Sequence, residues 1–99
     1  METSLITIEE RTQIEKKLAD VRQRNYFEIL ECLPDETLSR IEEKYRRLSY
    51  FYNPARFVGR VSEDQMDEIK TIHRVIEDAF GVLSDPGRRS SYRHALRLF

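Results

Sequence analysis

The spacing of the apolar residues constrains the fold of this chain more than any other feature. In the middle of the sequence, Ile41, Tyr45, Leu48 and Tyr52 follow one another at steps of four, three and four. At about 100° per residue, these side chains fall on one narrow stripe of an α-helix. No segment alternates apolar and polar residues for long enough to form a strand. The sequence therefore predicts an all-α fold.

Capping residues and apolar periodicity predict four or five helical segments. Their expected ranges are about 8–24, 26–30, 38–52, 63–83 and from 86 towards 98. Capping-box patterns begin the first and fourth segments at Thr7 and Ser62, each followed three residues later by Glu or Gln. Thr37 or Asp35 can cap the third segment. Pro86 suits the first position of the last helix, where its missing N–H costs nothing.

The apolar stripes of the later segments supply a candidate core. The expected core residues are Ile41, Tyr45, Leu48, Tyr52, Ile69, Ile76, Phe80, Leu83 and Tyr92. The first segment carries a thinner stripe, formed by Ile14, Leu18 and Val21, and the rest of it is charged or polar. A stripe this narrow is expected to dock either on the long helices of the same chain or on a second copy, which would give self-association.

Composition limits the functions open to the chain. Its 99 residues suffice for one domain, and the net charge of −1 argues against capture of nucleic acid by bulk electrostatics. The single cysteine, Cys32, cannot form an internal disulfide and is expected to be a small packed residue. No signal peptide and no run of about 20 apolar residues is present, so a cytoplasmic location without membrane insertion is expected. Leu96 and Phe99 leave the sequence ending on an apolar side chain, which suggests a piece of a longer protein.

No pattern indicates an enzyme, a cofactor or a metal site. The sequence has no Gly-rich phosphate loop, no adjacent nucleophile and base, and no ligand-like spacing of His, Cys and carboxylates. His73 is expected to be a partly buried structural residue, because His94 lies in another helix. The acidic residues around position 64 are best explained by the favourable interaction of carboxylates with a helix N-terminus.

Several separated blocks of residues resemble the J domain of DnaJ-type co-chaperones. They agree in order and register with the family over about 70 residues, from about 25 to 95. The blocks are 25–30 (Asn-Tyr-Phe-Glu-Ile-Leu), 45–48 (Tyr-Arg-Arg-Leu), 82–86 (Val-Leu-Ser-Asp-Pro) and 88–92 (Arg-Arg-Ser-Ser-Tyr). The resemblance implies an antiparallel hairpin of two long helices flanked by short first and last helices. Residues 25–99 would form this J-like domain, and residues 1–24 would add an accessory helix.

The sequence departs from the family at the turn after the second helix of the J domain. There, J-domain co-chaperones carry His-Pro-Asp, which engages a DnaK-type chaperone and triggers its ATP hydrolysis. The matching residues here are Asn53, Pro54 and Ala55. Pro54 keeps the turn, but Asn53 cannot carry an imidazolium charge and Ala55 has no carboxylate to accept a charge-assisted hydrogen bond.

This departure predicts a pseudo-J domain, a non-catalytic module that scaffolds or recruits a protein partner without stimulating a DnaK-type ATPase. The alternative is a divergent co-chaperone that still binds such a chaperone. On residues 38–52, a second line about 80° from the core stripe carries Arg40, Lys44, Arg47 and Phe51. Aromatic residues with arginine are typical of interface hot spots, although Phe51 could equally be a rim residue that covers the loop.

The loop after Pro54 supplies further candidates for partner contact. Arg56, Phe57 and Arg60 lie in a segment that is more apolar than a solvated loop, and some bacterial J-like modules carry a similar Arg-Phe-x-Gly-Arg. We expect Phe57 to fold back between the two long helices, with an exposed anchor as the alternative. Gly59 supplies the backbone freedom for the return. Arg56 and Arg60 could contact an acidic partner.

Overall fold

The computed structural model describes residues 5–97, and all its regular elements are helices. They are α1 (Ile8–Gln23), α2 (Tyr26–Ile29), α3 (Leu38–Phe51), the 3-10 helix η1 (Pro54–Phe57), α4 (Glu63–Leu83) and α5 (Pro86–Arg97). No strand occurs between residues 5 and 97. The predicted all-α fold is confirmed, and the predicted helix ends agree to within one residue wherever the structure describes them.

Local capping explains why these boundaries could be predicted. In α1, the backbone N–H of Glu10 donates to Thr7 Oγ1 and the N–H of Thr7 donates to Glu10 Oε1, both at 3.0 Å. Ser62 forms the same reciprocal box at the start of α4. For α3 it is Thr37, and not Asp35, whose side chain accepts a hydrogen bond from the first turn. Residues 54–57 were expected to be irregular and instead form η1, a single turn too short to show apolar periodicity.

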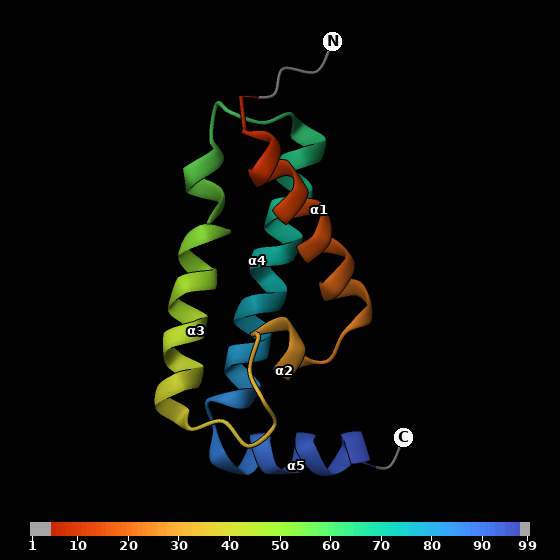
Figure 1. Ribbon diagram of the computed structural model, residues 1–99, viewed down its shortest axis with the longest axis vertical. Coiled ribbons are helices and arrows are strands. Elements are labelled where there is room, and N and C mark those ends of the chain that lie inside the picture. Colours follow the sequence, from red (N-terminus) through yellow and green to blue (C-terminus); the bar gives the residue numbers. More distant parts are fainter. Residues whose placement is uncertain (1–4, 98–99) are drawn as a thin grey trace.

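α4 is the central helix of the molecule. α1, α2, α3, α5 and η1 all pack against it, and α3 runs antiparallel to it (Figure 1). Figure 1 shows α3 and α1 on opposite sides of α4, while α5 crosses the end at which α4 finishes. The molecule is elongated, with extents of 47 × 27 × 18 Å. The predicted hairpin of two long helices is therefore present, with α1 added beside it.

Most of the expected core residues are buried. Those that are buried are Ile41, Leu48, Tyr52, Ile69, Ile76 and Leu83. Tyr45, Phe80 and Tyr92 are only half-buried, which corrects the prediction. The rings of Tyr45 and Phe80 stack at 3.9 Å between α3 and α4. Both rings lie at the edge of the contact between the two helices, where a tyrosine hydroxyl can still reach a polar partner. The Tyr45 hydroxyl donates a hydrogen bond to the Glu77 carboxylate at 2.6 Å.

The short segment around α2 contributes more to the core than the sequence suggested. Phe27, Ile29 and Leu30 are at most 1% exposed, and Cys32 is buried beside them, as expected. The Tyr92 hydroxyl accepts a hydrogen bond from the backbone N–H of Tyr26 at 2.9 Å. This contact ties α5 to α2 across the end of the hairpin.

α1 docks on the same chain. Ile14 and Leu18 are 4% and 7% exposed, and Val21 is partly buried against the core. The partner of this stripe is α4. Of the two expectations for α1, docking on the long helices is confirmed. The stripe is thus mostly covered within the chain, while self-association through α1 stays an untested prediction.

Candidate functional site

The turn after α3 is closed by its own side chains. Asn53 caps η1, because its Oδ1 accepts a hydrogen bond from the backbone N–H of Ala55 at 3.0 Å. Pro54 occupies the first position of this helix, where no N–H is needed. Asn53 and Ala55 are both exposed. The turn therefore presents an amide and a methyl group to solvent and no charge.

Arg56 fastens the turn to α3. Its Nη1 donates to the backbone carbonyl of Phe51 at the end of that helix. Its guanidinium carbon lies 5.0, 5.2 and 5.4 Å from the ring centres of Tyr50, Phe51 and Phe57. A cation within about 6 Å of an aromatic ring is attracted by its quadrupole. Arg56 is thus engaged within the chain.

Arg60 ties the loop to the start of α1. Its Nη2 lies 2.9 Å from Glu10 Oε1, and its carbonyl accepts a hydrogen bond from the N–H of Leu5 at 2.7 Å. The pKa of the Glu10 carboxyl is lowered, mainly by the hydrogen bond from the Thr7 backbone and further by the Arg60 charge, against the opposing effect of burial. Both loop arginines, proposed as partner contacts, therefore already hold the loop in place.

Phe57 lies beneath these arginines and is 0% exposed. It folds into the core as expected, so it is not a surface anchor and is removed from the candidates for partner contact. Gly59 follows with a φ of 78°, the left-handed conformation that glycine adopts without steric cost. The loop is thus a rigid return from α3 to α4, built around one buried ring.

The second line on α3 remains at the surface. Arg40 and Arg47 are exposed, Lys44 is half-buried, and Phe51 is half-buried with its ring 4.8 Å from that of Tyr52. Arg40 and Arg47 both lie within 4 Å of the Glu43 carboxylate. Such exposed pairs are worth only a few tenths of a kcal/mol. Arg40 and Arg47 can therefore leave their ion pairs with Glu43 and bind a partner's carboxylate at little cost in free energy.

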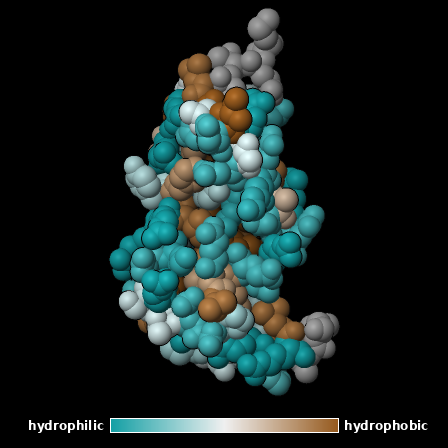
Figure 2. Space-filling view, viewed as in Figure 1, coloured by the Kyte–Doolittle hydropathy of each residue, from teal (hydrophilic) through white to brown (hydrophobic). Residues whose placement is uncertain are grey.

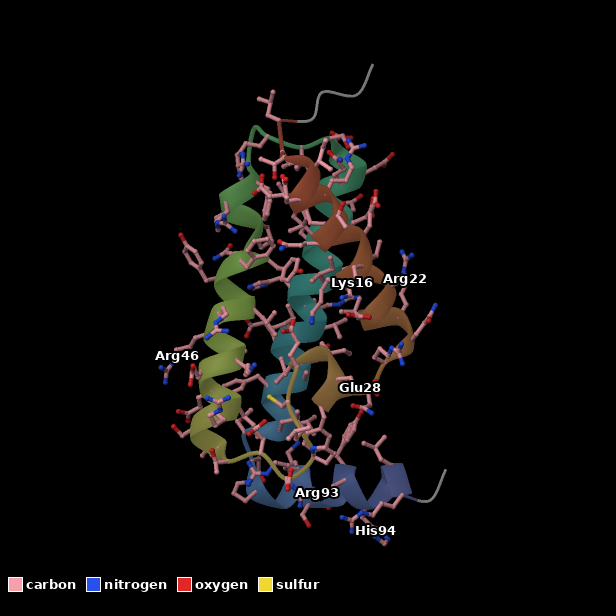
Figure 3. All side chains as sticks on the ribbon, viewed as in Figure 1. Lys16, Arg22, Glu28, Arg46, Arg93 and His94 are labelled. Atoms are coloured by element: carbon pink, nitrogen blue, oxygen red, sulfur yellow. The ribbon has the colours of Figure 1, made fainter. Side chains whose placement is uncertain are left out.

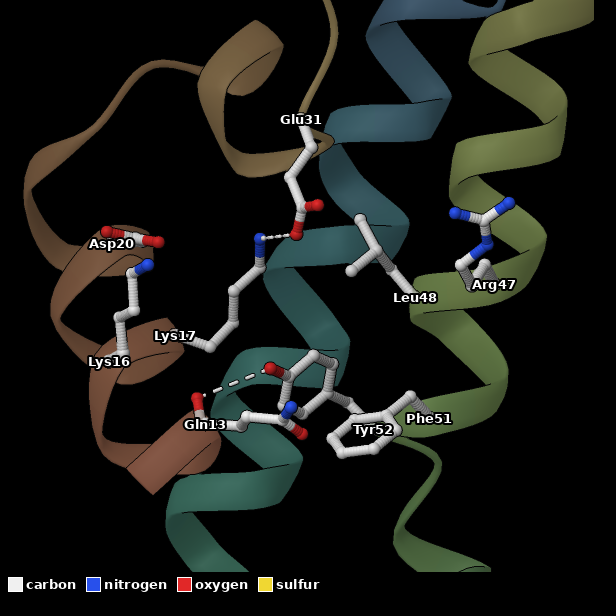
Figure 4. A pocket seen from close by; sticks show the side chains of 9 residues that line it. All are labelled: Gln13, Lys16, Lys17, Asp20, Glu31, Arg47, Leu48, Phe51 and Tyr52. Carbon is white, nitrogen blue, oxygen red and sulfur yellow. Dashed lines mark hydrogen bonds and ion pairs between the residues drawn. The ribbon is translucent and has the colours of Figure 1, made fainter. Parts of the chain in front are cut away.

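A groove of about 540 Å³ separates this face of α3 from α1 (Figure 4). Its lining residues come from both helices and from the segment after α2. They are Gln13, Lys16, Lys17, Asp20, Glu31, Arg47, Leu48, Phe51 and Tyr52. Sequence reasoning had named Arg47 and Phe51, but not the opposite wall on α1. The groove thus brings Arg47 and Phe51, two of the predicted partner-contact residues, opposite residues of α1 that the sequence did not indicate.

Tyr52 closes the floor of the groove at one end. Its hydroxyl donates to the backbone carbonyl of Gln13 at 3.3 Å, which links the end of α3 to α1. Burial, together with the nearby Glu31 and Asp20 carboxylates, raises the pKa of Tyr52 to about 12. The neutral phenol is therefore the form that this site stabilises.

Lys17 is the residue that sequence reasoning missed most completely. It is 3% exposed, and its ammonium group donates to the carbonyl of Ile29 and to Glu31 Oε2. Glu31 reaches it from a left-handed backbone conformation, with a φ of 59°. The signal available was position, because Lys17 lies three residues after Ile14 and so falls on the buried side of α1.

Other chemical features of the described residues indicate structural roles. Burial raises the pKa of the Cys32 thiol, whose Sγ lies 3.3 Å from the carbonyl of Leu30. His73 Nε2 lies 3.3 Å from Ser49 Oγ and 3.4 Å from a Glu77 carboxylate oxygen.

Between residues 5 and 97, no group of His, Cys, Asp and Glu side chains could hold a metal ion. Within the same range, no helix has both the length and the apolar content to cross a bilayer.

Comparison with known proteins agrees with the helical arrangement. The DnaJ domain family model matches residues 25–93. Similar curated proteins include the chaperone protein DnaJ of Methanosarcina thermophila, 36% identical over 69 residues, which are 70% of this chain and 16% of that protein. The adaptation to cold protein J of Shewanella oneidensis is 34% identical over 68 residues, which are 69% of this chain and 71% of that protein.

The chaperone protein DnaJ of Helicobacter pylori is 37% identical over 68 residues, which are 69% of this chain and 17% of that protein. The match thus spans less than a fifth of the length of the DnaJ chaperones of Methanosarcina thermophila and Helicobacter pylori. No solved structure matches the chain closely enough to be counted as similar. The family match leaves α1 outside it and takes in α2, α3, α4 and most of α5. With its two-helix hairpin and this match over most of its length, the chain belongs to the DnaJ domain (J-domain) family.

Proposed function

We propose that this chain is a pseudo-J domain, a non-catalytic module that recruits or scaffolds a protein partner without stimulating a DnaK-type ATPase. The observation that carries the proposal is the turn formed by Asn53, Pro54 and Ala55. The side chain of Asn53 is used to cap η1, and position 55 offers only a methyl group. The family's turn has an imidazole and a carboxylate at these two positions.

The missing carboxylate has an energetic consequence. A hydrogen bond in which one partner is charged contributes about 1.5–3 kcal/mol, roughly twice a neutral one. An arginine on the chaperone that depends on this acceptor would lose that contribution and remain partly desolvated. The nearest charges along the loop are those of Arg56 and Arg60, both cationic. Arg56 is already engaged with α3 and Arg60 with Glu10, so the turn offers the chaperone's cation no negative charge where the family offers a carboxylate.

A divergent co-chaperone that still binds a DnaK-type chaperone is the second candidate. The basic side chains of Arg40, Lys44 and Arg47 favour it, because the family also uses a basic face on this helix. The field is diluted, however, since Arg46 and Arg47 each lie 3.4 Å from a glutamate one helical turn earlier. Binding without stimulation would be compatible with the scaffold proposal, whereas stimulation would not.

Single-turnover ATP hydrolysis by a DnaK-type chaperone tests the proposal. We expect the chain to leave the rate unchanged while an active J domain, added as the positive control, accelerates it. The double variant Asn53→His/Ala55→Asp should gain binding to the chaperone if α3 is still competent. Acceleration by the natural chain that disappears in Pro54→Ala would refute the proposal, because it would show that the altered turn still acts on the chaperone.

A further inference from the structure

We infer that the groove between α1 and α3 binds an amphipathic helix of a protein partner, one that carries acidic side chains beside its apolar ridge. The inference rests on the proposed function, because it names the site and the kind of partner for a protein-binding module. It extends beyond the family's contact surface, which the groove shares only through Arg47 on α3, since the other wall is α1, which lies outside the matched residues 25–93.

The shape of the groove fits the ridge of a helix. α1 and α3 lie on opposite sides of α4 and form two walls (Figure 1). The volume of about 540 Å³ has room for a row of side chains but not for a whole helix, which is about 10 Å in diameter. A partner helix would therefore lie above the groove with its apolar residues inserted, the helix-in-groove mode of recognition.

The floor of the groove is apolar and aromatic. Leu48, Phe51 and Tyr52 line it, and Leu48 and Tyr52 are 8% and 6% exposed. Figure 2, drawn from the same side as Figure 1, shows apolar surface in the middle of this face between hydrophilic flanks. Because Leu48 and Tyr52 are already buried, the apolar side chains of the partner would themselves leave water on this floor and would cover the half-exposed ring of Phe51.

The charges of the groove favour an acidic partner. Lys17 is buried and has three N–H donors, of which Ile29 and Glu31 accept two. Figure 4 shows its side chain reaching from α1 into the groove towards Glu31. One N–H of a desolvated ammonium group is therefore left for a further acceptor. A carboxylate would complete this set with a charge-assisted hydrogen bond.

The two rims add to this preference. Lys16 on α1 and Arg47 on α3 both line the groove. Among the ion pairs within residues 5–97, none involves Lys16, and that of Arg47 is exposed. With the Lys17–Glu31 pair set aside, the lining keeps two cations, Lys16 and Arg47, against the one carboxylate of Asp20. Acidic residues on a partner would find a cation on either side of its ridge.

Other modes of peptide binding fit the structure less well. An added strand needs a free sheet edge, and residues 5–97 contain no strand. A basic helix would face the Lys17 ammonium group and the two rim cations, which disfavours it. These alternatives become outcomes of the test.

The test uses a fluorescein-labelled amphipathic peptide of about 18 residues, with leucines at helical spacing flanked by glutamates. A twin peptide carries lysine in place of each glutamate. Binding to the full chain is followed by fluorescence anisotropy, and the contact surface is mapped by amide chemical shifts. The groove variant is Lys16→Glu/Arg47→Glu.

The matched control is Arg22→Glu/Arg46→Glu, which makes the same charge change on the same two helices. Arg46 lies 3.4 Å from Glu42, the same distance that separates Arg47 from Glu43. Figure 3 shows Arg22 and Arg46 extending outwards from opposite sides of the molecule. Circular dichroism of each variant checks that the helices are retained.

We expect the acidic peptide to bind and to shift amides of α1 and α3. The groove variant should weaken its binding by about tenfold or more, and the control by less than about twofold. The lysine twin should bind the natural chain more weakly. Absence of binding, equal binding of the two peptides, or shifts confined to the turn at Pro54 would overturn the inference. None of these results depends on ATP hydrolysis, so failure of the groove and failure of the proposed function remain distinguishable.

Discussion

Truncation of Phe57 tests how the turn after α3 is held. The ring is 0% exposed, and replacing a buried phenylalanine with alanine costs about 3–5 kcal/mol through lost transfer energy and the cavity that remains. Small domains have only about 5–15 kcal/mol of total stability. We therefore expect Phe57→Ala to remove a large share of the free energy of unfolding, and at the lower end of that range to leave the chain partly unfolded.

Phe57→Leu separates packing from the electrostatics of the ring. Leucine keeps most of the apolar volume but cannot attract the guanidinium groups of Arg56 and Arg60, which lie 5.4 and 5.6 Å from the ring centre. Each such contact is worth about 0.5–1 kcal/mol at a partly exposed site. The two lost contacts and about 1 kcal/mol for the change of side-chain shape should together lower the free energy of unfolding of Phe57→Leu by about 2–3 kcal/mol.

Urea unfolding followed by far-UV circular dichroism measures these losses. Val58→Ala is the neighbouring control, because Val58 is 72% exposed and should change stability by less than about 0.5 kcal/mol. In an Arg56→Gln background, the cost of Phe57→Leu should shrink by about 0.5–1 kcal/mol. If Phe57→Ala were as stable as Val58→Ala, the ring of Phe57 would not be part of the core. If Phe57→Leu cost the same free energy of unfolding with and without Arg56→Gln, the Arg56 guanidinium would not contribute through the ring.

Two further predictions concern the elements around the groove. Leu18→Ala should lower the free energy of unfolding by about 2–5 kcal/mol, measured by urea unfolding. The control is Ile8→Ala, at an 82% exposed position of the same helix, which should lower it by less than about 0.5 kcal/mol. Equally small effects of the two changes would show that α1 is not part of the fold. Tyr52→Phe should cost up to about 1 kcal/mol at pH 8 through the lost hydrogen bond to Gln13. Because folding raises the pKa of Tyr52 to about 12, the natural chain loses stability as pH rises from about 10 towards 12, so the phenylalanine variant should become the more stable of the two near pH 11. A stability difference that stays constant up to pH 11.5 would contradict this assignment.

The sequence predicted most accurately those features that are encoded locally. The capping boxes at Thr7 and Ser62 fix helix starts through residues three positions apart, so the sequence alone predicts both starts. The turn at Pro54 was placed correctly, but η1 was not expected. A single 3-10 turn depends on one side-chain cap, here Asn53, and leaves no repeating pattern.

Features that depend on distant residues were predicted less well. Tyr45 has the helical spacing of a core residue, yet only the position of α4 determines that its ring stacks at the edge. Lys17 looks like its neighbour Lys16 in the sequence, and its burial depends on a carbonyl 12 residues away and a carboxylate 14 residues away. The groove itself joins positions from 13 to 52. No periodicity within one helix could reveal a surface that two helices share.

The central position of α4 has a consequence for how the molecule unfolds. Since every other described element packs against this one helix, no pair of helices holds a core of its own. Detaching α1 would uncover the apolar surface of α4 that Ile14 and Leu18 now cover. Amide hydrogens in the middle of α4 should therefore exchange with solvent only when the whole domain opens, while those of α5, which has no fully buried residue, can exchange through local fraying.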